Sequence, residues 1–167
     1  MISLVVLLAM QAADRREPGK SNVTLSVCNV LAHDPTILNG KIIRIKGYVG
    51  GTDEGTWLMG DCQTHLVTKG LTWGNDIAWY INLAEEKTAR SWERYAKKLK
   101  RLRPDWQHDR IWVTVAGRLE TRRTMDDPVV QTPYGLARVG FGHLSSSPAE
   151  IDVMSIETID VERNKEP

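Results

Sequence analysis

The sequence is poor in the residue types from which metal sites, thiol chemistry and histidine catalysis are built. Its 167 residues include two cysteines, four histidines and one phenylalanine. The histidines lie on separate predicted elements, and a lone histidine is usually a surface or capping group. No paired carboxylates, no nucleophile beside a base and no phosphate-binding glycine loop stand at the short spacing that catalysis needs. We therefore expect no enzyme, no cofactor and no metal.

An excess of charge of one sign is also absent. Lys and Arg total 22 and Asp and Glu total 21, so the net charge of +1 implies no polyanionic partner. The distribution is uneven, because residues 87–103 carry eight basic side chains and one acidic one. This basic helix face is either a solvated surface or a contact for nucleic acid, lipopolysaccharide or anionic lipid. Its residues are Arg90, Arg94, Lys97, Lys98 and Arg101.

A hydrophobic run long enough to cross a membrane is missing as well. Residues 2–10 are the longest apolar stretch, whereas a spanning helix needs about 20 residues. Gln11-Ala12-Ala13 and then charged residues follow, as in a signal peptide. The usual positively charged start is absent, which leaves a buried strand as the alternative. We predict a signal peptide at 1–13, a flexible lead at 14–25 and one domain at 26–167, exported to the periplasm or outside the cell.

The two cysteines, Cys28 and Cys62, fall on different predicted elements. A disulfide between them is the favoured interpretation, and it agrees with export. The alternative is a metal site, since His33 follows Cys28 and His65 follows Cys62. The first of these spacings is not a common zinc pattern, so we predict the disulfide.

The remaining pattern is that of a mainly β domain. Ser26 caps a short helix that begins at Val27, and alternating apolar residues predict a first strand at 41–49. Further strands are predicted at 56–59, 77–83, 110–121 and 151–159, with a helix at 88–103. A shift of the apolar positions before Ile156 predicts a bulge, and 122–149 reads as a long loop.

Three strands, a helix and two strands is the order of the five-stranded OB-type Greek-key barrel, whose helix lies between strands three and four. The segments Ile-Arg-Ile-Lys-Gly-Tyr-Val (43–49), Val-Thr-Val-Ala-Gly-Arg-Leu (113–119) and Gly-Phe-Gly-His-Leu (140–144) carry a further likeness. In these the chain resembles small uncharacterised exported OB-fold-like proteins of bacteria. The resemblance implies a fold and no activity, because that group has no agreed biochemical role.

An OB barrel binds ligands on strands two and three and on the loops after strands one and four. That surface would hold an aromatic set able to stack on bases or sugars, together with one histidine: Trp57, Tyr80, Tyr134, Phe141 and His143. The structural alternative is that rings fill the core and that His143 only bonds the backbone. We expect an exported binding or envelope-associated module whose ligand is a glycan, peptide or small molecule. A nucleic-acid-binding OB domain is the alternative, and a secreted hydrolase or nuclease is third.

Overall fold

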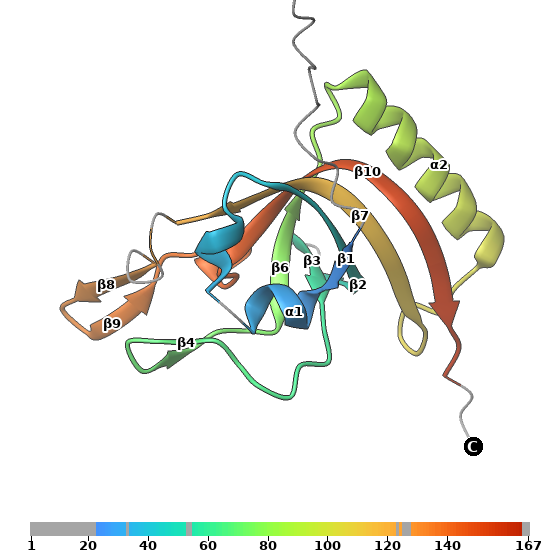
Figure 1. Cartoon of the computed structure of the whole chain (residues 1–167). Helices are drawn as coiled ribbons and strands as arrows, with labels where there is room; N and C mark the ends of the chain where they lie inside the picture. The colour runs from blue at the N-terminus through green and yellow to red at the C-terminus, as the bar shows by residue number, and fades with distance from the viewer. Residues whose placement is uncertain (1–22, 33, 53–54, 123, 125–127, 165–167) are drawn as a thin grey trace, which may run out of the picture.

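The computed structural model describes residues 23–32, 34–52, 55–122, 124 and 128–164 (Figure 1). The predicted signal peptide, 1–13, and most of the predicted lead, 14–25, lie outside these residues. The last two residues of that lead, Thr24 and Leu25, belong to a strand, β1 (Thr24–Ser26). No helix in the described part of the chain is long and apolar enough to cross a membrane.

One large mixed sheet dominates the molecule. It contains β1, β2 (Ile42–Thr52), β3 (Gly55–Met59), β6 (Asp76–Tyr80), β10 (Ala149–Glu162) and β7 (Arg110–Thr121), in that order, and β2 also pairs with β7. The β1–β2 and β6–β10 pairs are parallel, and the other pairs are antiparallel. The prediction of a mainly β chain is therefore confirmed.

The apolar alternation of the long strands places one side of each in the core. In β2 the side chains of Ile43 and Ile45 are buried, and in β7 those of Val113 and Val115 are buried. Gly117 of β7 has a different role, because a Cβ there would collide with the backbone carbonyl of Asp152. Glycine thus allows the close approach of β7 and β10.

The disulfide predicted from the sequence is present. Cys28 lies on α1 (Val27–Leu31), a short helix whose N-cap Ser26 accepts a hydrogen bond from the backbone N–H of Asn29. Its sulfur is bonded to that of Cys62, which follows β3, with the Cα atoms 5.2 Å apart. A metal site that uses both cysteines is excluded by this bond, and His33 lies outside the described residues. A 3-10 helix, η1 (Pro35–Leu38), leads from α1 into β2.

The long helix α2 (Glu86–Leu102) lies along β10 (Figure 1). The helix predicted at 88–103 is confirmed, and the spacing of its apolar residues puts them on one side: Tyr95 is buried, and Trp92, Leu99 and Leu102 pack against the core. The helix ends at Arg103, whose left-handed backbone (φ 47°) closes the last turn before Pro104. The predicted bulge in β10 is also confirmed, since the register with β7 shifts between Val153 and Ser155.

The prediction of a plain loop at 122–149 is wrong. This segment contains a hairpin, β8 (Val129–Thr132) with β9 (Gly135–Arg138), and a 3-10 helix, η2 (His143–Ser145). A second short hairpin, β4 (Val67–Thr68) with β5 (Leu71–Thr72), was not predicted either. Runs of two to four residues are too short to show a period. Their turns carry the clearer signal, since Lys69 and Gly70 both have positive φ, as two-residue hairpin turns of type I′ require.

The third predicted strand, 77–83, ends early. Strand β6 stops at Tyr80, and Leu83 is exposed. Asn82 then directs the chain towards α2, because its side-chain oxygen accepts a hydrogen bond from the backbone N–H of Ala84. Asparagine favours turns through this bond, which competes with continued strand pairing.

Candidate functional site

A groove runs between α2 and the far end of the β2–β3 hairpin. It has a volume of about 690 Å³, and four of the residues that line it are aromatic. We call it the aromatic groove. It is lined by Val49, Gly50, Gly51, Thr52, Thr56, Trp79, Trp92, Tyr95, Ala96, Leu99 and Trp106.

One wall of the aromatic groove is the edge of a strand. Side chains alternate across a strand, yet the four consecutive residues from Val49 to Thr52 all line the groove, so it follows the edge of β2. The pairing of β2 with β7 ends at Tyr48, whereas its pairing with β3 continues to Thr52. From Val49 to Gly51, β2 is therefore paired with β3 alone among the strands that the structure describes.

Three aromatic rings form the floor. Trp79 comes from β6, and Trp92 and Tyr95 come from α2. Trp79 meets Trp92 and Tyr95 edge to face at 6.5 and 6.4 Å between centroids, and Trp92 lies 5.1 Å from Tyr95. Offset and edge-to-face contacts of this kind are favourable, so the three rings stabilise one another in this arrangement. Burial raises the pKa of Tyr95 to about 12, which keeps its hydroxyl neutral at physiological pH.

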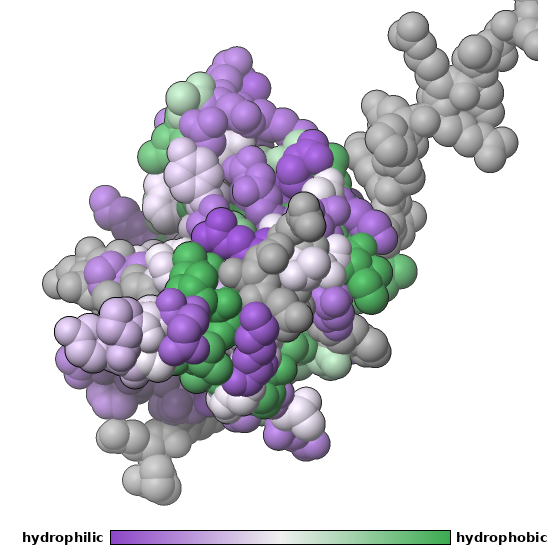
Figure 2. Space-filling view, turned by 90° about the vertical axis from the view of Figure 1, so that its left-hand side faces the viewer, coloured by the Kyte–Doolittle hydropathy of each residue, from purple (hydrophilic) through white to green (hydrophobic). Residues whose placement is uncertain are grey.

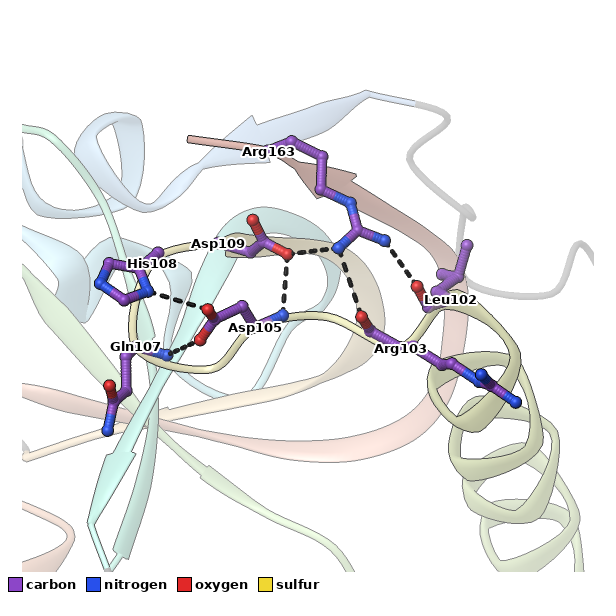
Figure 3. A network of polar contacts seen from close by, with 7 residues as sticks. All are labelled: Leu102, Arg103, Asp105, Gln107, His108, Asp109 and Arg163. Carbon is purple, nitrogen blue, oxygen red and sulfur yellow. Dashed lines mark hydrogen bonds and ion pairs between the residues drawn. The ribbon is translucent and has the colours of Figure 1, made fainter. Parts of the chain in front are cut away.

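Trp106 stands at the mouth of the groove with 64% of its surface exposed. It belongs to the connection between α2 and β7, which is anchored by Arg163, a residue that follows β10 (Figure 3). The Arg163 guanidinium donates to the carbonyl oxygen of Leu102 at 2.6 Å and pairs with the Asp109 carboxylate at 2.7 Å. Arg163 thus joins the end of α2, the connection that follows it and the segment after β10, beside Trp106.

The turn that carries Trp106 has its own hydrogen bonds (Figure 3). The Asp109 carboxylate accepts from the backbone N–H of Asp105 at 2.8 Å, and the Asp105 carboxylate accepts from the backbone N–H of Gln107 at 3.0 Å. His108 Nδ1 lies 2.8 Å from the same Asp105 carboxylate, and this hydrogen bond lowers the pKa of Asp105. The backbone on both sides of Trp106 is therefore held in place.

The lining of the groove contains no side chain that is charged at neutral pH, but its helix wall borders a basic cluster. Lys97, Lys100, Arg101 and Arg103 line a second, more open hollow on α2. Two members of the predicted basic helix face are otherwise engaged: Arg90 pairs with Glu86, and Lys98 donates to the carbonyl oxygen of Ile159 at 2.7 Å. Arg94, Lys97 and Arg101 form no ion pair within the described residues.

The predicted site residues lie elsewhere. Trp57 and His143 come close together, since a Cβ on Gly142 would lie 3.2 Å from Trp57 Nε1 and one on Gly55 would lie 3.4 Å from the Cβ of His143. Phe141, in the same loop, lies under the Arg122 guanidinium, 4.6 Å from ring centroid to Cζ.

Tyr80 lies two residues after Ala78, the partner of Trp57 across the β3–β6 pair, and so shares the face of Trp57, whereas Tyr134 lies on a different hairpin. Tyr80 is 54% exposed at the end of β6, and Tyr134 is fully exposed in the turn between β8 and β9. Figure 2 shows the side of the molecule on which the β8–β9 hairpin lies, and polar residues separate the apolar residues on this side. None of the five predicted residues lines the aromatic groove.

The segment 140–147 is held by the half-buried carboxyl group of Asp76. Asp76 accepts a hydrogen bond from the Ser147 hydroxyl, and burial raises the pKa of Asp76. A Cβ on Gly140 would collide with the Ser147 carbonyl oxygen and lie 2.8 Å from the Trp73 ring, so only glycine fits there. No group of three or more His, Cys, Asp or Glu residues among the described ones is arranged to hold a metal ion.

The sequence analysis expected aromatic rings in the core as its structural alternative, and the rings of the groove floor are of that kind. Trp79, Trp92 and Tyr95 do pack against the core, and their other edges line the groove. Trp106 was not singled out. The available signal was a tryptophan two residues after Pro104, in a connection with no apolar neighbour to pack on.

Comparison of the chain with protein-family models, curated proteins and solved structures finds no match. The function must therefore be argued from the aromatic groove itself.

Proposed function

We propose that this protein is an exported binding module that holds its ligand in the aromatic groove. The observation that carries the proposal is a preformed hollow of about 690 Å³ with four aromatic rings in its lining. Ligand pockets are commonly of this size, mostly apolar, and equipped with a few polar groups that orient the ligand. Here the polar groups are the backbone edge of β2 and the hydroxyl of Thr56.

The fold that we propose for the module is the OB-type Greek-key barrel. Strand pairings run from β2 to β3, β6, β10, β7 and back to β2, which is the ring expected for five barrel strands. The parallel pairing of β6 with β10 and the position of α2 between β6 and β7 also support it. In such a barrel the groove lies beside the hairpin of the first two strands.

Export is supported by the disulfide. Bonds such as Cys28–Cys62 persist in oxidising compartments and are rare in the cytosol. The apolar segment at 1–13 agrees with export, and its role as a signal peptide stays a prediction. The ligand is accordingly one that occurs in the periplasm or outside the cell: a glycan, a peptide or a small molecule.

The experiment is a fluorescence screen of oligosaccharides, peptides and aromatic small molecules, repeated with two variants. In Ala96→Trp an indole ring takes the place of a methyl group on the exposed side of α2 and fills the groove. We therefore expect this substitution to abolish binding. Tyr134→Ala removes a fully exposed ring outside the groove, so we expect unchanged affinity. Loss of binding in Tyr134→Ala with retention in Ala96→Trp would contradict the proposal.

Nucleic-acid binding is the second candidate, and one observation favours it. The unpaired Arg94, Lys97 and Arg101 give α2 a positive outer surface, as proteins that bind polyanions have. In the same screen, binding of single-stranded DNA that survives Ala96→Trp and weakens steeply with salt would favour this candidate.

A further inference from the structure

We infer that the ligand of the aromatic groove is a proline-rich peptide segment in the polyproline II conformation, held by contact with the rings and by hydrogen bonds from their N–H and O–H groups. The inference rests on the proposed function and names the ligand class for the same groove. Two features carry it. The rings bear hydrogen-bond donors that have no partner within the described residues, and the side chains of the lining offer few acceptors.

The hydroxyl of Tyr95 is the first of these donors. Tyr95 is 4% exposed, and its hydroxyl forms no hydrogen bond with any described residue. A buried tyrosine hydroxyl usually has a partner, so this one requires an explanation. No side-chain nitrogen or oxygen among the described residues is both unpartnered and sealed from solvent, so the hydroxyl reaches solvent where Tyr95 lines the groove. Burial raises the pKa of Tyr95 to about 12, so the hydroxyl keeps the proton that it can donate in a hydrogen bond.

The indole N–H groups of the groove are the other donors. Trp79, Trp92 and Trp106 line the groove, and their N–H groups form no hydrogen bond within the described part of the chain. The buried indole of Trp73, in contrast, donates to the Thr68 hydroxyl at 3.2 Å. An indole nitrogen donates and does not accept. With the tyrosine hydroxyl, the rings therefore give the groove four donors.

The acceptors among the lining side chains are hydroxyl oxygens alone. They belong to Thr52, Thr56 and Tyr95, and the described lining contains no carboxylate and no side-chain amide. Asp53 and Glu54 follow Thr52 in the sequence and lie outside the described residues. A sugar carries a hydroxyl donor on most of its carbons, and each needs an acceptor once water is displaced. The lining therefore favours a ligand that accepts hydrogen bonds and donates few.

A proline-rich segment has this chemistry. Proline has no backbone N–H, and the polyproline II helix uses none of its carbonyl oxygens in internal hydrogen bonds. Its rings are apolar, and grooves lined by aromatic side chains bind such segments in several classes of module. The conformation exists before binding, so little conformational entropy is lost. Tyr95 and the three tryptophans thus offer one ligand both an apolar contact surface and hydrogen-bond donors.

The charges around the groove are compatible with an uncharged ligand. Lys100 and Arg103 line the neighbouring hollow, and Asp105 precedes Trp106 in the chain. A proline segment needs neither a positive nor a negative rim, so its binding does not depend on which of these charges prevails. We therefore expect its affinity to change little with salt, whereas the affinity for a nucleic acid falls steeply.

The test uses two uncharged peptides, acetylated decaproline amide and a Gly-Ser repeat peptide of the same length with the same end groups. Cellohexaose, a neutral oligosaccharide, is the third probe. Binding of each to the full chain is measured by calorimetry at low salt and at about 0.15 M salt, where distant surface charges are screened. The site variant is Tyr95→Phe, which removes the unpartnered hydroxyl and keeps the ring. The control is Tyr134→Phe, which removes the hydroxyl of a fully exposed ring outside the groove.

We expect decaproline to bind the wild type at both salt concentrations, and the other two probes to bind at least about tenfold more weakly. Tyr95→Phe should weaken binding of decaproline about three- to tenfold, as the loss of one hydrogen bond does. It should not lower the Tm, because the hydroxyl has no partner among the described residues. Tyr134→Phe should change neither the affinity nor the Tm.

Equal affinity for the two peptides, tighter binding of cellohexaose, or equal effects of the two tyrosine substitutions on binding would overturn the inference. Binding of decaproline that persists in Ala96→Trp would also overturn it, because the peptide would then lie outside the groove. The same variant separates the two proposals. If Ala96→Trp abolishes binding of another ligand of the screen while decaproline does not bind the wild type, the groove stands as the site and the proline-rich class fails.

Discussion

At the scale of single residues, the hydroxyl of Ser91 joins α2 to the bulge in β10. Ser91 is 2% exposed, and its Oγ accepts a hydrogen bond from the backbone N–H of Ile156 at 2.8 Å. The bulge shifts the ladder between β10 and β7, so the sheet needs a partner from outside for this N–H. Serine on the buried side of the helix supplies it.

Replacement of Ser91 by alanine should leave the partly buried N–H of Ile156 without this hydrogen-bond acceptor. We expect Ser91→Ala to lower the free energy of unfolding by about 1 to 3 kcal/mol, measured by urea denaturation. Glu93→Ala, two residues away on the exposed side, should change it by less than about 0.5 kcal/mol. Similar effects of the two substitutions would show that the hydrogen bond at the bulge does not stabilise the fold.

The carboxyl group of Asp76 predicts a pH dependence. Burial raises its pKa above the ordinary 3.8, against opposing effects of Ser147 and Arg138. A carboxyl that binds its proton more tightly in the fold contributes stability below its unfolded pKa and loses it as the pH rises through its folded pKa. Relative to Asp76→Asn, the wild type should therefore become less stable as the pH rises above about 4. Denaturation midpoints of both proteins across this pH range measure the difference, and a wild type that gains on the variant would contradict the account.

At the scale of elements, the long strands and the long helix were predictable because their periods extend over many residues. The alternation of Ile43 and Ile45 and the stripe of Trp92, Tyr95 and Leu99 each have one buried side in the structure. The β8–β9 hairpin was missed because four residues a side show no period. The sequence predicted the disulfide from cysteine count and context, and its two elements do meet.

The Cys28–Cys62 bond should stabilise the protein by restricting the unfolded chain. For a loop of sequence separation 34, the chain-entropy model gives about 3 to 4 kcal/mol. We expect reductant to lower the Tm of the wild type and to leave that of a Cys28→Ser/Cys62→Ser variant unchanged. Alkylation of both cysteines in denatured protein that has not been reduced would show that the bond does not form in solution.

At the scale of the whole molecule, the aromatic groove could not be predicted, because its walls come from distant parts of the chain. Val49 to Thr52, Trp79, the middle of α2 and Trp106 meet only after the sheet has folded and α2 has docked on β10. The sequence did indicate the loop after the first strand as part of a binding surface, and residues 50–52 line the groove. It placed the aromatic contacts on other residues instead: Trp57, Tyr80, Tyr134 and Phe141.

The six tryptophans provide a direct test of the groove as the binding site, because each indole N–H gives its own signal in a ¹H–¹⁵N spectrum. Trp79, Trp92 and Trp106 line the groove, whereas Trp57 lies beside Gly142, Trp73 is buried and Trp112 packs against Tyr48. The protein is titrated with the tightest-binding ligand of the fluorescence screen. The account predicts that the signals of Trp79, Trp92 and Trp106 shift and the other three stay in place. Shifts of Trp57 or Trp112 with the three groove signals unchanged would contradict it.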